Sequence, residues 1–69
     1  MATITQKLGD RIRQLRKKQG LSQEQVAAKA KIDLTTLNEI ENGNRNPSIR
    51  TVYKISLALN VNLSNLLNI

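Results

Sequence analysis

Two short helices with recognisable starts and stops follow one another in the middle of this sequence. Ser22 and Gln25 have the spacing of a capping box, in which the two side chains satisfy free backbone N–H groups at a helix start. Apolar spacing predicts helices over about 23–30 and 34–41, and Asn42-Gly43 provides a left-handed stop after the second. Helices of this length are marginal in isolation. They must therefore pack against one another, and this requirement restricts the fold more than any other feature of the chain.

The turn between these two helices is also specified by the sequence. Asp33 is expected to cap the second helix, and Ile32 just before it is expected to contact Leu37. Ala27 places a small side chain where the two helices must cross closely. Two short helices joined at a fixed angle form a helix-turn-helix, and its second helix is narrow enough to enter a DNA major groove about 12 Å wide.

The rest of the chain is predicted to be helical as well. No segment shows sustained alternation of apolar and polar residues, whereas three further stretches show helical spacing. One begins at a capping box formed by Thr3 and Gln6 and ends at Gly20, and the others begin at Pro47-Ser48 and Val61-Asn62. We therefore predict an all-α fold, with five helices in a single domain covering the whole chain. Its expected core is Leu8, Ile12, Leu15, Leu21, Val26, Ala27, Ala30, Ile32, Leu37, Ile40, Val52, Ile55, Leu59 and Leu66.

The composition excludes most enzyme mechanisms. The 69 residues include neither Cys nor His, which removes disulfides, thiolate or imidazole metal ligands, and nucleophile–base pairs that need imidazole. Among the five carboxylates, Glu39 and Glu41 are two residues apart on a helix and do not share a face. We expect no catalytic residue, no metal and no cofactor. Tyr53 is the single aromatic residue, so there is no row of rings on which the bases of a single strand could stack.

The charge of the chain favours an anionic partner. Eleven Lys and Arg against five Asp and Glu give a net charge of +6 at pH 7, which suits nucleic acid or an acidic membrane surface. No apolar run approaches the roughly 20 residues that span a bilayer, and no signal-peptide core is present. The first helix has a narrow apolar stripe and no Trp or Phe to anchor it in a membrane. We therefore expect a cytoplasmic protein that binds double-stranded DNA and no membrane.

The second helix of the motif is predicted to turn a polar face outward. In the major groove Asn can pair bidentately with adenine, Thr can offer a hydroxyl or a methyl, Glu can accept from cytosine, and Leu can pack on the thymine methyl. This face carries neither Lys nor Arg, which is unusual for a merely solvated face in so basic a chain. We predict base contacts from Leu34, Thr35, Asn38 and Glu39.

The loop after this helix is rich in cations and small polar donors, the residue types that hold phosphates. We expect contacts to the DNA backbone from Thr36, Asn44, Arg45, Asn46, Ser48 and Arg50. The basic residues of the first helix are interpreted mainly as a solvated face, with long-range attraction to an anionic partner as the alternative. They are Arg11, Arg13, Lys17 and Lys18.

A set of short motifs extends over nearly the whole chain. The motifs are Leu15-Arg16, Gly20-Leu21-Ser22-Gln23-Glu24, Ala27, Glu41-Asn42-Gly43 and Pro47-Ser48. Together they resemble the phage-repressor and Cro-like helix-turn-helix family, above all its short members such as restriction–modification controller proteins. The resemblance covers roughly residues 6–67 and implies a five-helix DNA-binding domain that acts as a homodimer on a palindromic operator.

The same resemblance implies roles for individual residues. It places Gln23 where family members touch a phosphate and brace the first side chain of the reading helix. It also pairs Arg16 with Glu41 in a structural ion pair that ties the first helix to the third. One position departs from the family pattern, because Lys31 stands where the turn often has Gly. A left-handed residue other than Gly costs roughly 1 kcal/mol, so either the turn is slightly different here or this cost is absorbed.

Leu57 falls opposite the apolar face of the predicted fourth helix. An exposed apolar residue there, together with others near the C-terminal end, would form a patch of the kind that often marks an interface. We predict a homodimer interface formed by Tyr53, Leu57, Val61, Leu63 and Ile69. A two-fold dimer would place its two reading helices about 34 Å apart, one turn of DNA.

These features predict a sequence-specific, double-stranded DNA-binding transcriptional regulator. Two alternatives on the same fold are kept. The first is the DNA-binding antitoxin of a toxin–antitoxin pair, which would co-purify with its toxin. The second is a protein-interaction adaptor, which would use the apolar C-terminal face and would leave no footprint on duplex DNA.

Overall fold

The computed structural model describes residues 2–69. Within this range the chain forms five helices, which confirms the predicted all-α fold. The helices are α1 (Ile4–Lys18), α2 (Gln23–Ala30), α3 (Leu34–Glu41), α4 (Ile49–Ala58) and α5 (Leu63–Leu66). The bounds of α2 and α3 agree with those predicted from the sequence.

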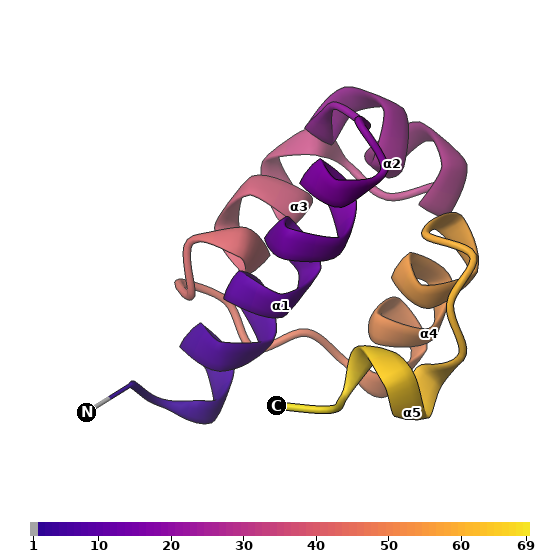
Figure 1. Ribbon diagram of the computed structural model, residues 1–69. Coiled ribbons are helices and arrows are strands. Elements are labelled where there is room, and N and C mark those ends of the chain that lie inside the picture. The colour runs from indigo at the N-terminus through magenta and orange to yellow at the C-terminus, as the bar shows by residue number, and fades with distance from the viewer. Residues whose placement is uncertain (1) are drawn as a thin grey trace.

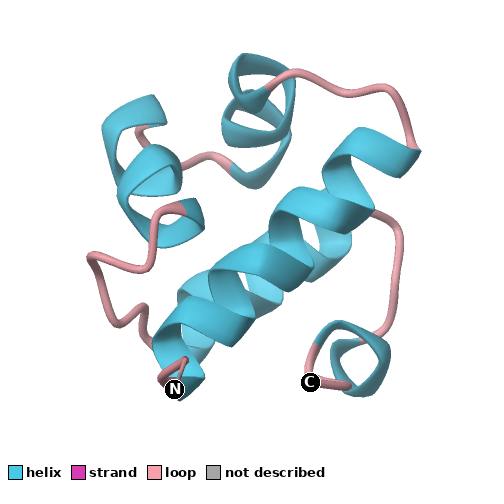
Figure 2. Ribbon diagram, turned by 60° about the vertical axis from the view of Figure 1, so that its left-hand side comes forward, coloured by secondary structure: helices cyan, strands magenta, loops and turns pink. Residues whose placement is uncertain are grey.

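Helix α1 runs through the middle of the molecule and contacts α3 and α5. Helix α2 packs on both α3 and α4, and α4 contacts α5 (Figure 1). Figure 2 shows the same helices linked by short loops around α1. The α2–α3 pair therefore forms the predicted helix-turn-helix. Helix α1 packs against α3, and α4 packs against α2.

The core agrees closely with the predicted set. The buried apolar side chains are Leu8, Ile12, Leu15, Val26, Ala27, Ala30, Leu37, Ile40, Val52, Ile55, Leu59 and Leu66. Leu21 and Ile32, predicted for the same core, are only partly buried and pack against its edge. Both follow directly on the left-handed residue that ends a helix, where the chain turns at the surface.

The first four helices end with the same hydrogen-bonded turn. Each is followed by a left-handed residue whose N–H, like that of the next residue, donates to a carbonyl in the last turn of the helix. Gly20 and Gly43 have φ of 70° and 75°, where glycine carries no penalty. Lys31 and Asn60 occupy the same region with φ of 58° and 55°. Lys31 is therefore left-handed, so the chain absorbs the cost at this turn and does not avoid it with a different turn.

The helix starts agree with the sequence except at α3. Thr3 and Ser22 form the two predicted capping boxes. Ser48 accepts from the Thr51 N–H and so caps α4, one residue beyond Pro47. The prediction that the Asp33 side chain caps α3 is wrong, because its carboxylate makes no capping hydrogen bond. Asp33 is exposed, where water can solvate its carboxylate, whereas Leu37 one turn further along α3 is buried in the core.

Gly9 is a buried contact that the sequence reading missed. A Cβ at Gly9 would lie 2.3 Å from the Ile40 carbonyl oxygen and 2.9 Å from that of Glu41. Helix α1 therefore approaches the C-terminal end of α3 more closely than any larger residue allows. Glycine in a helix interior costs about 1 kcal/mol relative to alanine. A glycine inside a predicted helix therefore suggests close packing, and this signal could have identified Gly9.

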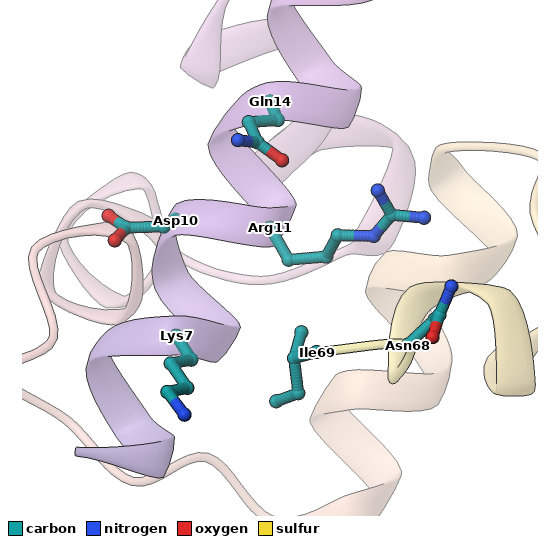
Figure 3. A pocket seen from close by; sticks show the side chains of 6 residues that line it. All are labelled: Lys7, Asp10, Arg11, Gln14, Asn68 and Ile69. Atoms are coloured by element: carbon teal, nitrogen blue, oxygen red, sulfur yellow. The ribbon is translucent and has the colours of Figure 1, made fainter. Parts of the chain in front are cut away.

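Helix α1 is tied to the C-terminal part of the chain by Arg11. Its Nη2 donates to the Asn65 carbonyl oxygen at 3.1 Å and to Asn65 Oδ1 at 3.0 Å. Lys7 and Arg11 line an open pocket with Ile69 of the chain end (Figure 3). Arg11 is therefore half-buried and structural, whereas the sequence suggested a solvated face.

Among residues 2–69 no helix is long and apolar enough to cross a membrane.

Candidate nucleic-acid interface

The predicted base-contacting residues lie on the outward face of α3. Thr35 and Asn38 are exposed, and Leu34 keeps 44% of its surface accessible. The opposite face of the helix buries Leu37 and Ile40 in the core. No other part of the described chain covers Thr35 or Asn38, so the polar side of α3 is accessible to a ligand.

The inner end of α3 is held by a buried ion pair. Arg16 Nε donates to Glu41 Oε2 at 2.8 Å, and Arg16 Nη2 donates to Glu41 Oε1 at 3.0 Å. The Glu41 side chain is fully buried and that of Arg16 is 11% exposed. Arg16 also donates through Nη1 to the Leu21 carbonyl oxygen at 2.9 Å. Because charge-assisted bidentate pairs are directional as well as strong, this contact fixes the position of α3 relative to α1.

A chain of side-chain hydrogen bonds leads from this ion pair to the outward face. Gln23 Nε2 donates to Glu41 Oε1 at 3.1 Å, and Asn38 Nδ2 donates to Gln23 Oε1 at 3.2 Å. Asn42 Nδ2 then donates to Asn38 Oδ1 at 3.1 Å. Arg13 links Asn42, the last residue of this chain of hydrogen bonds, back to Glu41. Its Nη2 donates to Asn42 Oδ1 at 3.1 Å and to the Glu41 carbonyl oxygen at 2.9 Å.

We call these six residues the polar network: Arg13, Arg16, Gln23, Asn38, Glu41 and Asn42. The interpretation of Arg13 as part of a solvated face is wrong, since it is half-buried and its Nε also lies 3.6 Å from Glu41 Oε1. Sequence reading missed both Arg13 and Asn42. The available signal was the three-residue spacing of Arg13 and Arg16, which puts both on one face of α1.

Glu39, the fourth predicted base-contacting residue, already has a partner. Arg45 Nε lies 3.2 Å from Glu39 Oε1, and the two side chains are 50% and 42% exposed. This pair links α3 to the loop that follows it. Glu39 is consequently less free to accept from a base than Thr35, although the pair is open to solvent.

The predicted backbone-contacting residues lie beside α3. Thr36 and Gln23 are half-buried at its edge, and the remainder are exposed on the loop and at the start of α4. That exposed set is Asn44, Arg45, Asn46, Ser48 and Arg50. Cations and a helix start next to an exposed polar helix form the arrangement that phosphates on either side of a groove require.

The predicted dimer residues differ in accessibility. Tyr53 and Leu57 are 51% and 61% exposed, and Ile49, 65% exposed, continues the same four-residue spacing along α4. Val61 and Leu63 are partly buried against the core of the same chain. Ile69 is exposed in the pocket beside α1. An exposed apolar stripe therefore runs along α4, and the sequence reading did not include Ile49 in it.

The fold and the exposed α3 define a helix-turn-helix domain. The family model described as helix-turn-helix matches residues 12–66, so this chain belongs to the helix-turn-helix family. With the relatives described next, this makes it a DNA-binding transcriptional regulator. It is similar to control protein C.MunI of a Mycoplasma species, with 43% identity over 96% of this chain and 90% of that protein. It is also 42% identical to the transcriptional regulator SinR of Bacillus licheniformis, over 88% of this chain and 56% of SinR.

The solved structures show the same fold. The restriction–modification controller protein C.AhdI from Aeromonas hydrophila superimposes with a TM-score of 0.88 and 35% identity, covering 90% of this chain and 94% of that one. The resemblance to controller proteins that the motifs indicated is confirmed by these matches.

Proposed function

We propose that this protein binds a palindromic operator as a homodimer and inserts α3 of each subunit into the major groove. The single observation that carries the proposal is the accessible polar face of α3, held in place from behind by the polar network. A reading helix must present its donors and acceptors in a fixed orientation, because the energy of base recognition depends on hydrogen-bond geometry.

Thr35 and Asn38 are proposed as the principal base contacts, with Leu34 packing on a thymine methyl. Glu39 is proposed to contact the bases together with its partner Arg45, or after Arg45 moves to a phosphate. The Glu39–Arg45 pair is solvent-exposed, and such pairs are worth under about 1 kcal/mol, so exchanging this partner for DNA is inexpensive.

The phosphates on either side of the groove are proposed to be held by Gln23, Thr36, Asn44, Arg45, Asn46, Ser48 and Arg50. These contacts position the protein without discriminating between sequences. Together with the net charge of +6, they predict that affinity falls steeply with salt, with a log–log slope near −0.9 for each neutralised phosphate.

The dimer is proposed to form through the exposed apolar side chains Tyr53 and Leu57 of α4, with Val61, Leu63 and Ile69 at the margin. One small helix-turn-helix reads few base pairs, and a two-fold pair doubles the recognised sequence. The similarity to C.MunI and C.AhdI supports a controller role, in which occupation of a site regulates restriction–modification genes.

Selection of bound duplexes from a random pool, followed by sequencing, tests this function. A palindromic consensus with half-sites one helical turn apart is the expected result. Binding without sequence preference would contradict the proposal. Co-purification with a neighbouring toxin would favour the antitoxin alternative, and absence of any footprint on duplex DNA would favour the adaptor.

A further inference from the structure

We propose that the polar network holds the side-chain amide of Asn38 in one orientation, so that Arg13 and Asn42 are positioning residues that make Asn38 select adenine. The inference deepens the proposed function and rests on it, because it requires α3 to read a duplex. Neither Arg13 nor Asn42 needs to touch a base for this role.

The direction of the hydrogen bonds is set at the buried end by Glu41. A carboxylate accepts hydrogen bonds and donates none. Gln23 must therefore turn Nε2 toward Glu41, where the distance is 3.1 Å. This leaves Gln23 Oε1 facing Asn38, which must present Nδ2 to it, at 3.2 Å.

The opposite end is set by Arg13. A guanidinium donates hydrogen bonds and accepts none. Asn42 must therefore present Oδ1 to Arg13 Nη2, at 3.1 Å, and is left with Nδ2 facing Asn38 Oδ1, also at 3.1 Å. Both ends impose the same direction on Asn38. Reversing its amide would place oxygen against oxygen at Gln23 and nitrogen against nitrogen at Asn42.

The groups that Asn38 has left match adenine. A primary amide has two N–H donors and two acceptor sites on its oxygen, and the network uses one of each. One donor and one acceptor are therefore free on an exposed side chain. In the major groove adenine offers one acceptor, N7, and one donor, N6, whereas guanine offers two acceptors. A fixed amide can satisfy both groups of adenine but only one of guanine.

Fixing the amide before binding also removes an ordering cost. A side chain that is already immobilised in the free protein loses little further conformational freedom on binding. The discrimination by Asn38 therefore depends on residues behind it. Arg13 stands at the far end of this chain of contacts, on a different helix from Asn38.

Duplex selection with variants of Asn42 tests this inference. An Asn38→Ala variant first identifies which position of the half-site Asn38 reads, and adenine is expected there. In Asn42→Asp the new carboxylate cannot donate to Asn38 Oδ1 and repels it. The preference for adenine at that position is expected to fall on the order of tenfold, while preferences elsewhere in the half-site persist. Asn42→Ala removes one contact without repulsion and should lose less.

Asn44→Asp is the matched control. It makes the same change of charge two residues along the chain, outside the polar network. It should weaken binding to all duplexes without changing the preference at the position that Asn38 reads. Thermal unfolding by circular dichroism verifies that each variant is folded. If Asn42→Asp does not fold, Asn42→Ala provides the test.

Two results would overturn the inference. One is a base other than adenine at the position lost in Asn38→Ala. The other is an adenine preference that survives in both Asn42 variants while affinity falls as in Asn44→Asp. A wild-type protein that selects no sequence would contradict the proposed function itself. A wild-type palindrome with unchanged preference in the Asn42 variants would remove only the positioning role.

Discussion

Helices α3 and α4 both bury apolar side chains in the core, but only α3 is also held by a network of polar side chains. The C-terminal end of α3 is fixed to α1 and α2 by the polar network, whose centre is the fully buried Glu41. The buried side of α4 consists mainly of apolar residues, including Val52 and Ile55. Hydrogen bonds fix orientation, whereas apolar burial is non-directional and contributes in proportion to area. The helix that we propose presents donors and acceptors to bases is thus the one that directional contacts fix.

The outward faces of the two helices differ in the same way. The outward face of α3 carries Thr35 and Asn38, and that of α4 carries Tyr53 and Leu57. In the proposed function the polar face of α3 recognises bases and the apolar face of α4 contacts a second subunit, so recognition and assembly are divided between two elements. Variants that affect one helix only should therefore separate the two functions.

The largest effect is expected at the ion pair. Arg16→Ala leaves the Glu41 carboxylate buried with less compensation, which typically costs about 3–5 kcal/mol of unfolding free energy. Urea unfolding monitored by circular dichroism measures this loss. Arg45→Ala is the control, because its pair with Glu39 is exposed and should contribute under about 1 kcal/mol. If Arg16→Ala melts like the wild type, the polar network does not hold α3 in place.

The next effect concerns assembly. Leu57→Glu introduces a charge into the proposed interface, and two-fold symmetry places the change twice in each dimer. Burying a leucine is worth roughly 1.5–3 kcal/mol, so the Kd of the dimer should rise about 100-fold or more. Sedimentation velocity should show monomers, and operator binding should weaken.

Ile4→Glu provides the comparison for Leu57→Glu. It makes the same chemical change at a residue of α1 that is 67% exposed, and it should leave the sedimentation of the protein unchanged. Equal sedimentation of Leu57→Glu and wild type would show that α4 does not form the interface.

A smaller effect is expected where α1 crosses α3. Gly9→Ala would place a methyl 2.3 Å from the Ile40 carbonyl oxygen, so the two helices must separate. Overpacking of this kind costs typically 1–3 kcal/mol, more than the gain of about 1 kcal/mol in helix propensity. Chemical denaturation should show net destabilisation, whereas Gln14→Ala on the exposed side of α1 should not. A more stable Gly9→Ala would mean that the crossing is looser than the structure indicates.

The parts of the fold set by local signals were predictable from the sequence. The capping box at Ser22 and the stop at Gly43 involve residues close in sequence, so the bounds of α2 and α3 followed from spacing alone. The core followed from helical periodicity for the same reason. Asp33 shows the limit of local rules, because a capping residue in the right position makes no capping hydrogen bond.

The parts set by contact between distant segments were less predictable. The Arg16–Glu41 contact was expected only from a family resemblance. Asn42 and Arg13 are 29 residues apart, and no local pattern connects them. Their contact depends on the close approach of α1 and α3 that Gly9 permits. The outward face of α3 was predictable, whereas the network that orients Asn38 required the tertiary structure.

The smallest effect distinguishes the ends of α2 and α4, which use the same turn with different residues. Lys31 has φ of 58° and Asn60 has φ of 55°. Asn tolerates the left-handed region better than Lys, because its short polar side chain can hydrogen-bond locally. Lys31→Gly should therefore stabilise the protein by up to about 1 kcal/mol, partly offset by the greater freedom of glycine in the unfolded chain, and Asn60→Gly by less. Thermal unfolding of both variants at matched salt measures the difference. A larger gain at Asn60 would mean that strain is greater beside the apolar helix α4 than at the turn before α3.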